Sequence, residues 1–155
     1  MPQSTFKTKP RIALVVSRFN EDVTNGLRDG ALAYLAEQGV DVQPEHIFPA
    51  PGAFETPLLA KKLAQTGKFE GVVCLGCVIK GDTAHFEYIS LGATIGLMSA
   101  TLETGLPITF GILTTYTDEQ ASVRSRKDSH NKGREAAAAC LDSLDTIASI
   151  MAVSA

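Results

Sequence analysis

Unbroken apolar runs alternate along the chain with stretches in which apolar residues recur every three or four positions. Three runs, at 11–17, 71–79 and 108–115, are rich in valine, isoleucine and leucine, as is typical of strands buried on both faces of a sheet. A fourth run, at 40–48, contains Pro44, which cannot donate a hydrogen bond inside a sheet. The pattern therefore predicts about four strands, of which the one at 40–48 is the least regular.

Apolar residues at helical spacing fill the segments between these runs. The first of these segments begins at Val23 and ends at Gly39, a residue that commonly stops a helix. A capping box formed by Thr117 and Gln120 predicts the start of a short helix. A further short helix is expected at 58–66, and longer helices at 84–104 and 132–151.

This alternation of strands and helices predicts the fold class. Parallel strands need crossover connections, and the helices in those crossovers cover both faces of the sheet. We therefore expect a three-layer α/β sandwich of the flavodoxin-like kind, with a four-stranded parallel sheet, in one domain over 1–155 whose first ten residues form a flexible tail. Ligands bind such sheets beyond the carboxyl ends of the strands. Functional residues are therefore expected in the segments 17–22, 51–56, 80–85 and 114–119.

Composition and charge exclude several classes of function. Hydrophobic residues make up 45% of the 155 residues and charged residues 20%, as in an ordinary soluble domain. The net charge is −3 and there is no basic run, which argues against nucleic-acid binding. No apolar run approaches the roughly 18 residues of a membrane span, and residues 1–10 lack the apolar centre of a signal peptide. These observations predict a cytoplasmic protein.

Three cysteines raise the possibility of redox or metal chemistry. Cys74 and Cys77 form a C-x-x-C pair, but the pair lies inside a predicted buried strand, whereas thioredoxin-like pairs lie at a helix start. Core packing is therefore the favoured interpretation. Together with Cys140 the thiols are odd in number, which fits a reducing compartment. We expect no metal site.

The segment 80–85 carries the clearest candidate chemistry. Gly81 permits a close backbone approach, and either Asp82 or Thr83 can cap the helix that follows. The free N–H groups of a helix start bind anions such as phosphate, and His85 on the first turn can transfer protons. Asp82 would repel an anion unless it turns away. The alternative is an ordinary loop with a solvent-facing histidine.

Aromatic residues mark two further loops. Phe54 and Glu55 pair an apolar ring with a carboxylate, which suits a heterocycle that carries hydroxyl groups. Phe19 and Asn20 repeat the theme with a stacking surface and an amide. The alternative for each phenylalanine is packing into the core, and the position of Phe110 within a predicted strand favours that interpretation for it.

Cations are concentrated in the segment 123–133. Such a run is usually a solvated helix face. Arg124 is nevertheless placed to bind a phosphate with two hydrogen bonds if the chain folds back over a site. His46 and His130 are interpreted as surface residues.

Four segments, at 18–20, 51–55, 76–89 and 107–115, together resemble the lumazine synthase family of riboflavin biosynthesis. They occur in the family's order and spacing, and the resemblance extends over nearly the whole chain. It implies that a ribityl-substituted diaminopyrimidine condenses with 3,4-dihydroxy-2-butanone 4-phosphate. The products would be 6,7-dimethyl-8-ribityllumazine, phosphate and water, and no cofactor or metal would take part.

The resemblance also implies roles for individual residues. His85 would carry the protons, and Phe19 would stack on the pyrimidine ring. Arg124 and Phe110 would come from a neighbouring subunit. The residues implied for the pyrimidine and ribityl groups are Phe19, Asn20, Ala53, Phe54, Glu55, Cys77, Val78, Ile79, Phe110 and Lys132, and those implied for the phosphate are Gly81, Asp82, Thr83 and Arg124.

The family assembles as pentameric rings, so the resemblance implies a homopentamer. Relatives that build sixty-subunit shells carry glycines in the turn before the position of Asn131, whereas this chain has a charged turn without glycine there. Together with Pro2 and Pro10 in the tail, this predicts free pentamers or pairs of pentamers rather than shells. The helix at 84–104 is expected to line the ring through a stripe formed by Ile89, Ala93, Gly96, Leu97 and Ala100.

Two other functions are compatible with parts of this pattern. A non-catalytic relative that binds a flavin or lumazine would keep the stacking ring, but it should lack His85 or Arg124, and both are present. A flavodoxin-type electron carrier would need a hydroxyl-rich phosphate loop after the first strand, where this chain has arginine and acids at 18–22. A structural, shell-forming role is compatible with catalysis.

Overall fold

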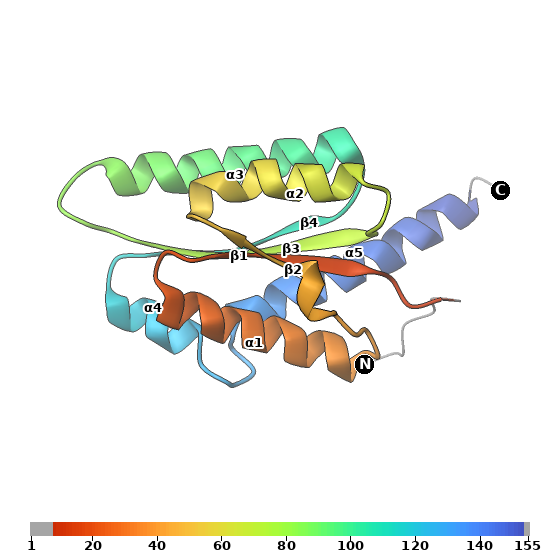
Figure 1. Cartoon of the computed structure of the whole chain (residues 1–155), viewed down its shortest axis with the longest axis horizontal. Helices are drawn as coiled ribbons and strands as arrows, with labels where there is room; N and C mark the ends of the chain where they lie inside the picture. Colours follow the sequence, from red (N-terminus) through yellow and green to blue (C-terminus); the bar gives the residue numbers. More distant parts are fainter. Residues whose placement is uncertain (1–7, 154–155) are drawn as a thin grey trace.

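The computed structural model describes residues 8–153, so most of the predicted tail, residues 1–7, lies outside the described residues. Four parallel strands form one sheet between two layers of helices, as Figure 1 shows. This arrangement confirms the predicted three-layer α/β fold. In chain order the strands are β1 (Ile12–Ser17), β2 (Ile47–Ala50), β3 (Gly71–Ile79) and β4 (Ile108–Thr115), and in space their order is β2-β1-β3-β4.

The two central strands are β1 and β3, and they are buried almost throughout. β3 pairs with β1 on one side, from Ile12 opposite Gly71 onwards, and with the full length of β4 on the other. Because helices cover both faces of these strands, apolar residues are needed at every position rather than at alternate ones. This requirement explains why the unbroken apolar runs predicted β1, β3 and β4 with bounds that the structure confirms within one residue.

The predicted strand at 40–48 is wrong in its position. A single 3₁₀ turn, η1 (Pro44–His46), precedes β2, and the strand includes Pro49. β2 is an edge strand that pairs only with β1 in this sheet. An edge strand needs fewer backbone donors, so it accepts a proline that a central strand would not.

Helices α1 (Glu21–Glu37) and α5 (Lys132–Val153) cover one face of the sheet, and α2 (Thr56–Gln65) and α3 (His85–Thr104) cover the other (Figure 1). The short helix α4 (Asp118–Arg124) follows the end of β4. Each layer has its own apolar core: Leu27 and Leu141 belong to the first, and Val72 and Leu97 to the second.

The capping box at the start of α4 is confirmed in part. Thr117 Oγ1 accepts a hydrogen bond from the backbone N–H of Gln120 at 3.1 Å. The side chain of Gln120, however, accepts from the N–H of Tyr116 at 2.9 Å, one residue before the cap. The box therefore also fixes the end of the loop after β4.

The prediction that one stripe of α3 lines a ring of subunits is wrong. Ala93, Leu97 and Ala100 are buried within the chain, and Pro57 of α2 lies against Gly96. These residues therefore form the inner face of α3. The outer face carries large apolar side chains instead, each more than half exposed: Tyr88, Leu91, Ile95, Met98 and Leu102.

Within residues 8–153, α5 alone has the length and apolar composition of a helix that could cross a membrane. A core helix of a soluble domain meets the same two criteria, and the first half of α5 is such a helix. Ala137, Cys140 and Leu141 are buried against the sheet layer. The end of the helix is exposed at Ile150 and Val153.

Candidate active site

A cavity of about 450 Å³ lies beyond the carboxyl ends of β1 and β3, where the fold predicts ligand binding. Its wall combines the loop after β1, the turn η2 (Ala53–Glu55), the end of β3 and the start of α3. Three of the four segments predicted to carry function therefore meet at one place. The lining residues are Phe19, Pro51, Gly52, Ala53, Phe54, Glu55, Cys77, Val78, Ile79, Gly81, Thr83, His85, Phe86 and Ile89.

The turn after β2 is held by a buried hydroxyl group. Thr56 Oγ1 donates to the carbonyl oxygen of Ala53 at 2.7 Å, which fixes η2 at the start of α2. Phe54 is 56% exposed, so the alternative of a core phenylalanine is wrong. Its ring lies against α3 at Gly92, where a Cβ atom would come within 2.7 Å of the ring. The absence of a side chain at Gly92 therefore leaves the space that the Phe54 ring occupies beside α3.

Phe19 stands at the rim of the cavity and is 68% exposed. Its backbone N–H donates to Ser17 Oγ at 3.2 Å, which shapes the tight exit from β1. Exposing an aromatic ring to water is unfavourable in free energy, and a ligand stacked on the ring would remove that apolar surface from water. The position therefore suits the predicted stacking surface.

Asn20 has a left-handed backbone with φ of 61°, and it is the one non-glycine residue with positive φ among the described residues. Its Nδ2 donates to the carbonyl oxygen of Cys77 at 2.9 Å and so ties the end of β1 to the end of β3. Asn20 does not line the main cavity but a neighbouring hollow that it shares with Asp118 and Ser122. The predicted contact with a ribityl chain stays a prediction.

The end of β3 forms an inert wall of the cavity. Cys77 is 2% exposed, and burial, together with the negative charge of Asp118, raises the pKa of its thiol to about 11. Cys74 and Cys140 are also buried and unbonded. These observations support core packing for the C-x-x-C pair. Among residues 8–153, no group of His, Cys, Asp or Glu is arranged to hold a metal ion.

The start of α3 differs from the predicted cap. The N-cap position is Ala84, and neither Asp82 nor Thr83 caps the helix in the usual way. Thr83 Oγ1 instead accepts a long hydrogen bond of 3.4 Å from the N–H of His85. A helix start without a side-chain cap keeps donors for an external anion.

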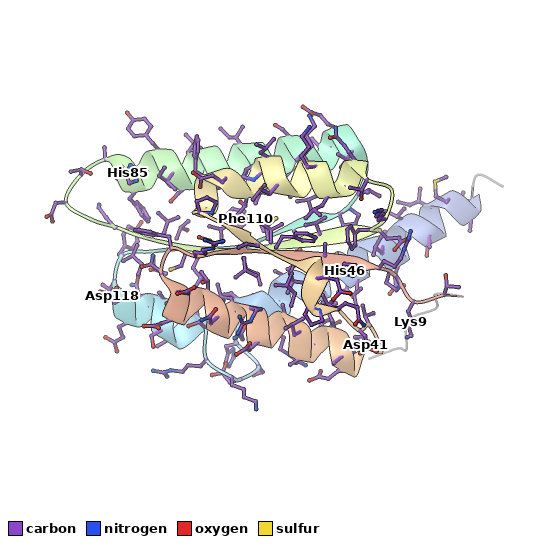
Figure 2. All side chains as sticks on the ribbon, in the orientation of Figure 1. Lys9, Asp41, His46, His85, Phe110 and Asp118 are labelled. Carbon is purple, nitrogen blue, oxygen red and sulfur yellow. The ribbon has the colours of Figure 1, made fainter. Side chains whose placement is uncertain are left out.

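His85 lies on the first turn of α3, as Figure 2 shows. It lines the cavity together with Gly81 and Thr83. It is exposed, so the ring can exchange protons with a bound ligand or with water. Asp82 is exposed and does not line the cavity. The carboxylate of Asp82 therefore lies outside the cavity, as an anion site at the start of α3 would require.

The remaining predicted residues lie elsewhere in the chain. Phe110, Arg124 and Lys132 line a second hollow, of about 420 Å³, along β4 and the start of α5. Phe110 is 44% exposed, so its interpretation as a core residue is wrong. Arg124 Nη1 donates to the carbonyl oxygen of Gln120 at 3.0 Å, and Lys132 forms an ion pair with Glu135 at 2.8 Å. One chain therefore does not bring these three residues to the cavity that holds His85.

Sequence reasoning missed two residues of the cavity wall that lie outside the four predicted segments, and it misjudged one histidine. Phe86 and Ile89 line the cavity from the first two turns of α3. Ile89 lies four positions after His85 and so shares its face of the helix, a spacing that could have found it, whereas Phe86, one position after His85, gives no such signal. His130 is exposed as expected, whereas His46 is half-buried, with its ring 5.0 Å from that of Phe69.

Comparison with known proteins gives matches over most of the chain. The family model described as 6,7-dimethyl-8-ribityllumazine synthase matches residues 9–148. A curated relative from Caulobacter vibrioides, named 6,7-dimethyl-8-ribityllumazine synthase 1, is 64% identical over 89% of this chain and 90% of its own length. Relatives named 6,7-dimethyl-8-ribityllumazine synthase from Salinibacter ruber and Protochlamydia amoebophila are 48% and 44% identical, over 85% and 89% of this chain and 85% and 80% of their own lengths.

Proposed function

The chain belongs to the 6,7-dimethyl-8-ribityllumazine synthase family, and from this premise we propose how its residues carry out the reaction. As a member it is a transferase of riboflavin biosynthesis. It condenses 5-amino-6-ribitylaminopyrimidinedione with 3,4-dihydroxy-2-butanone 4-phosphate to give 6,7-dimethyl-8-ribityllumazine, phosphate and water. The observation that carries the assignment of residues is the cavity that joins Phe19, η2, the end of β3 and His85.

The pyrimidine substrate stacks on Phe19 and lies along the backbone of Cys77, Val78 and Ile79. Its ribityl chain extends towards Glu55, whose carboxylate accepts hydrogen bonds from hydroxyl groups. The exposed ring of Phe19 and its place on the cavity rim support this orientation. We assign Asn20 a bracing role at this end of the site, because its amide is bonded to the Cys77 carbonyl group.

The phosphate of the second substrate lies at the start of α3, near Gly81 and Thr83. The 5-amino group of the pyrimidine adds to the ketone and one water leaves, which gives an imine. The C–O bond to phosphate then breaks as phosphate is eliminated, and the neighbouring hydroxyl-bearing carbon becomes a carbonyl. The ribityl-bearing nitrogen closes the ring onto that carbonyl as a second water leaves. Each of these steps moves a proton, and His85 lies on the same helix turn as the phosphate site. Holding both substrates in one cavity removes much of the entropic barrier, so one proton carrier is sufficient.

A neighbouring subunit completes the site. Phe110, Arg124 and Lys132 are separated from the cavity within one chain, and they share an exposed hollow along β4. The apolar outer face of α3, which includes Leu91, Ile95 and Met98, supports an extensive contact between copies. We propose a closed pentamer in which the β4 hollow of one subunit covers the cavity of the next. Free pentamers or pairs of pentamers are expected, and light scattering would distinguish either from a sixty-subunit particle.

A cytoplasmic location accompanies this function. Cys74, Cys77 and Cys140 are free thiols, as is usual in a reducing compartment.

The direct test is to mix the purified protein with both substrates and to follow the fluorescence of the lumazine. We expect product well above the uncatalysed rate, and no loss of rate when a metal chelator is added. A rate equal to that of the substrates alone would contradict the proposed function and favour a non-catalytic relative.

A complementation experiment tests the shared site. His85→Ala and Arg124→Ala, each nearly inactive at low phosphate substrate, are co-expressed so that the two chains form mixed assemblies. If His85 and Arg124 come from neighbours, about a quarter of the sites in a random mixture contain both native residues. If both residues served a site within one chain, mixing would restore nothing. The singly expressed variants are the controls.

A further inference from the structure

The loop between α4 and α5 is anchored by one buried polar residue. Asn131 is 1% exposed, although it directly follows a charged segment, 124–130, in which every residue except the half-buried Ser125 is exposed. Its Nδ2 donates to the carbonyl oxygen of Gly26 in α1 at 3.0 Å and to that of Arg126 in the loop at 2.9 Å. Its Oδ1 accepts from the N–H of Arg134 at 3.0 Å. Both amide protons are therefore used, and three separate elements meet at one side chain.

Three glycines make room for this arrangement. A Cβ atom at Gly30 would overlap with the amide group of Asn131, and one at Gly26 would overlap with the carbonyl oxygen of Ser125. A Cβ atom at Gly133 would overlap with the carbonyl oxygen of Leu27. The backbone of α1 thus touches the loop and the first turn of α5 directly. No larger residue fits at these positions without moving the loop.

The anchored loop carries the two cations of the β4 hollow at its ends. Arg124 is the last residue of α4, and Lys132 is the first of α5. Two hydrogen bonds within the loop are short-range: Asp128 N–H donates to the Arg126 carbonyl group at 2.9 Å, and His130 N–H donates to Asp128 Oδ1 at 2.8 Å. Those bonds shape the loop but do not fix it relative to the rest of the chain. The bond from Asn131 to Gly26 fixes the loop on α1, which packs against the sheet.

We propose that Asn131 is a positioning residue for the phosphate-bearing substrate, because it fixes the α4–α5 loop on α1 and so sets where Arg124 is presented to the neighbouring cavity. This proposal rests on the proposed function and deepens it. Arginine binds phosphate through a rigid pair of donors, so a small displacement of its backbone weakens the contact. The ligand class is a phosphate monoester or inorganic phosphate.

The test uses two changes on different elements. Asn131→Asp keeps the shape and the acceptor for Arg134, but it places an oxygen against the carbonyl groups of Gly26 and Arg126. Gly30→Ala keeps the asparagine at position 131, but the new Cβ atom on α1 would push the amide group of Asn131 out of its position. Alanine itself favours the helix, so the substitution should not weaken α1. The matched control is Asp29→Ala, an exposed neighbour on the same helix.

We expect both variants to raise the KM for the butanone phosphate about 5–20-fold, as for a weakened charge-assisted contact, while kcat and the KM for the pyrimidine change less than about twofold. The dissociation constant of inorganic phosphate, measured by calorimetry on the intact assembly, should rise by a similar factor. Asp29→Ala should match the parent protein. Because calorimetry needs no turnover, it tests Asn131 even if the parent makes no lumazine.

Two results would overturn the proposal. One is a fall in kcat, or in the fraction of active protein, with the phosphate KM and dissociation constant unchanged, because that would show a purely structural role. The other is phosphate binding equal to that of the parent in both variants. If Asn131→Asp fails to assemble, Gly30→Ala decides the question alone.

Discussion

The two helical layers cover the same sheet, but their outer surfaces differ. Apart from the exposed apolar end of α5, the α1 and α5 layer carries ion pairs where it meets solvent: Arg134 forms one with Glu37 at 2.6 Å, and Arg28 forms one with Asp29. The outer face of α3 instead exposes large apolar side chains, such as Leu102 at 75%. Within residues 8–153, no element covers this outer face of α3, and Arg124 lies outside the cavity that the start of α3 lines.

A charge on the outer face of α3 tests this difference most severely. We expect Ile95→Glu to prevent assembly, because a buried carboxylate without a partner costs several kcal/mol. Activity should fall by more than about 100-fold, although every site residue is still present. The measurements are mass by light scattering and the rate of lumazine formation.

The matched control for that change is Ala36→Glu, which places the same charge on an exposed position of α1. It should leave both mass and rate unchanged. An Ile95→Glu variant that stays assembled and active would show that α3 does not face a neighbour.

The second contrast separates the cavity from the β4 hollow. Arg124→Ala should raise the KM for the butanone phosphate about 10–100-fold, because it removes hydrogen bonds between charged groups. His85→Ala should mainly lower kcat, by about 10–100-fold, because a proton carrier acts on the chemical step. Steady-state kinetics with each substrate varied in turn would distinguish the two. An unchanged phosphate KM in Arg124→Ala would remove this residue from the site.

A smaller effect is expected at the rim. Phe19→Ala should raise the KM for the pyrimidine about 3–10-fold, as for the loss of one aromatic stacking contact. Phe19→Trp should largely preserve binding, because the position needs only a flat apolar surface in water. Strong loss with tryptophan and mild loss with alanine would instead indicate that the ring packs inside the protein.

The last prediction concerns stability rather than activity, at the inert wall formed by the end of β3. In the folded chain the pKa of Cys77 is raised to about 11, mainly by burial. The unfolded thiol titrates nearer 8.5, so the unfolded state loses its proton first as the pH rises. The free energy of unfolding should therefore fall between pH 8.5 and 11, by up to about 1.4 kcal/mol per pH unit from this thiol. Urea unfolding should show a weaker fall in Cys77→Ala, and equal slopes would contradict the assignment.

The apolar pattern was sufficient to predict the sheet, because β1 and β3 are buried on both faces and Ser17, at the end of β1, is their one polar residue. It failed for β2, a four-residue edge strand whose sequence resembles a loop. It also failed for the orientation of α3. Both Ala93 on the inner face and Ile95 on the outer face are apolar, so periodicity could not show which side meets the sheet.

For the site, the rule that ligands bind at strand ends located Phe19, Glu55 and His85 correctly around one cavity. Two features were beyond this reasoning. The bond from Asn20 to Cys77 joins residues 57 positions apart, and the anchoring by Asn131 joins residues 105 positions apart. Sequence spacing contains no information on such distant polar contacts, whose positions depend on how the finished layers pack.

The order of the strands along the chain has a consequence for biosynthesis. β1, β2 and β3 leave the ribosome first, and they are neighbours in the sheet without β4. Residues up to Ile89 provide every wall of the cavity, whereas Phe110, Arg124 and Lys132 are translated afterwards. A nascent chain can therefore fold its own cavity before it possesses the surface that we propose to serve another subunit. In the proposed pentamer, translation order would make each chain a recipient before it is a donor, because the residues proposed to complete a neighbour's cavity belong to the last third of the message.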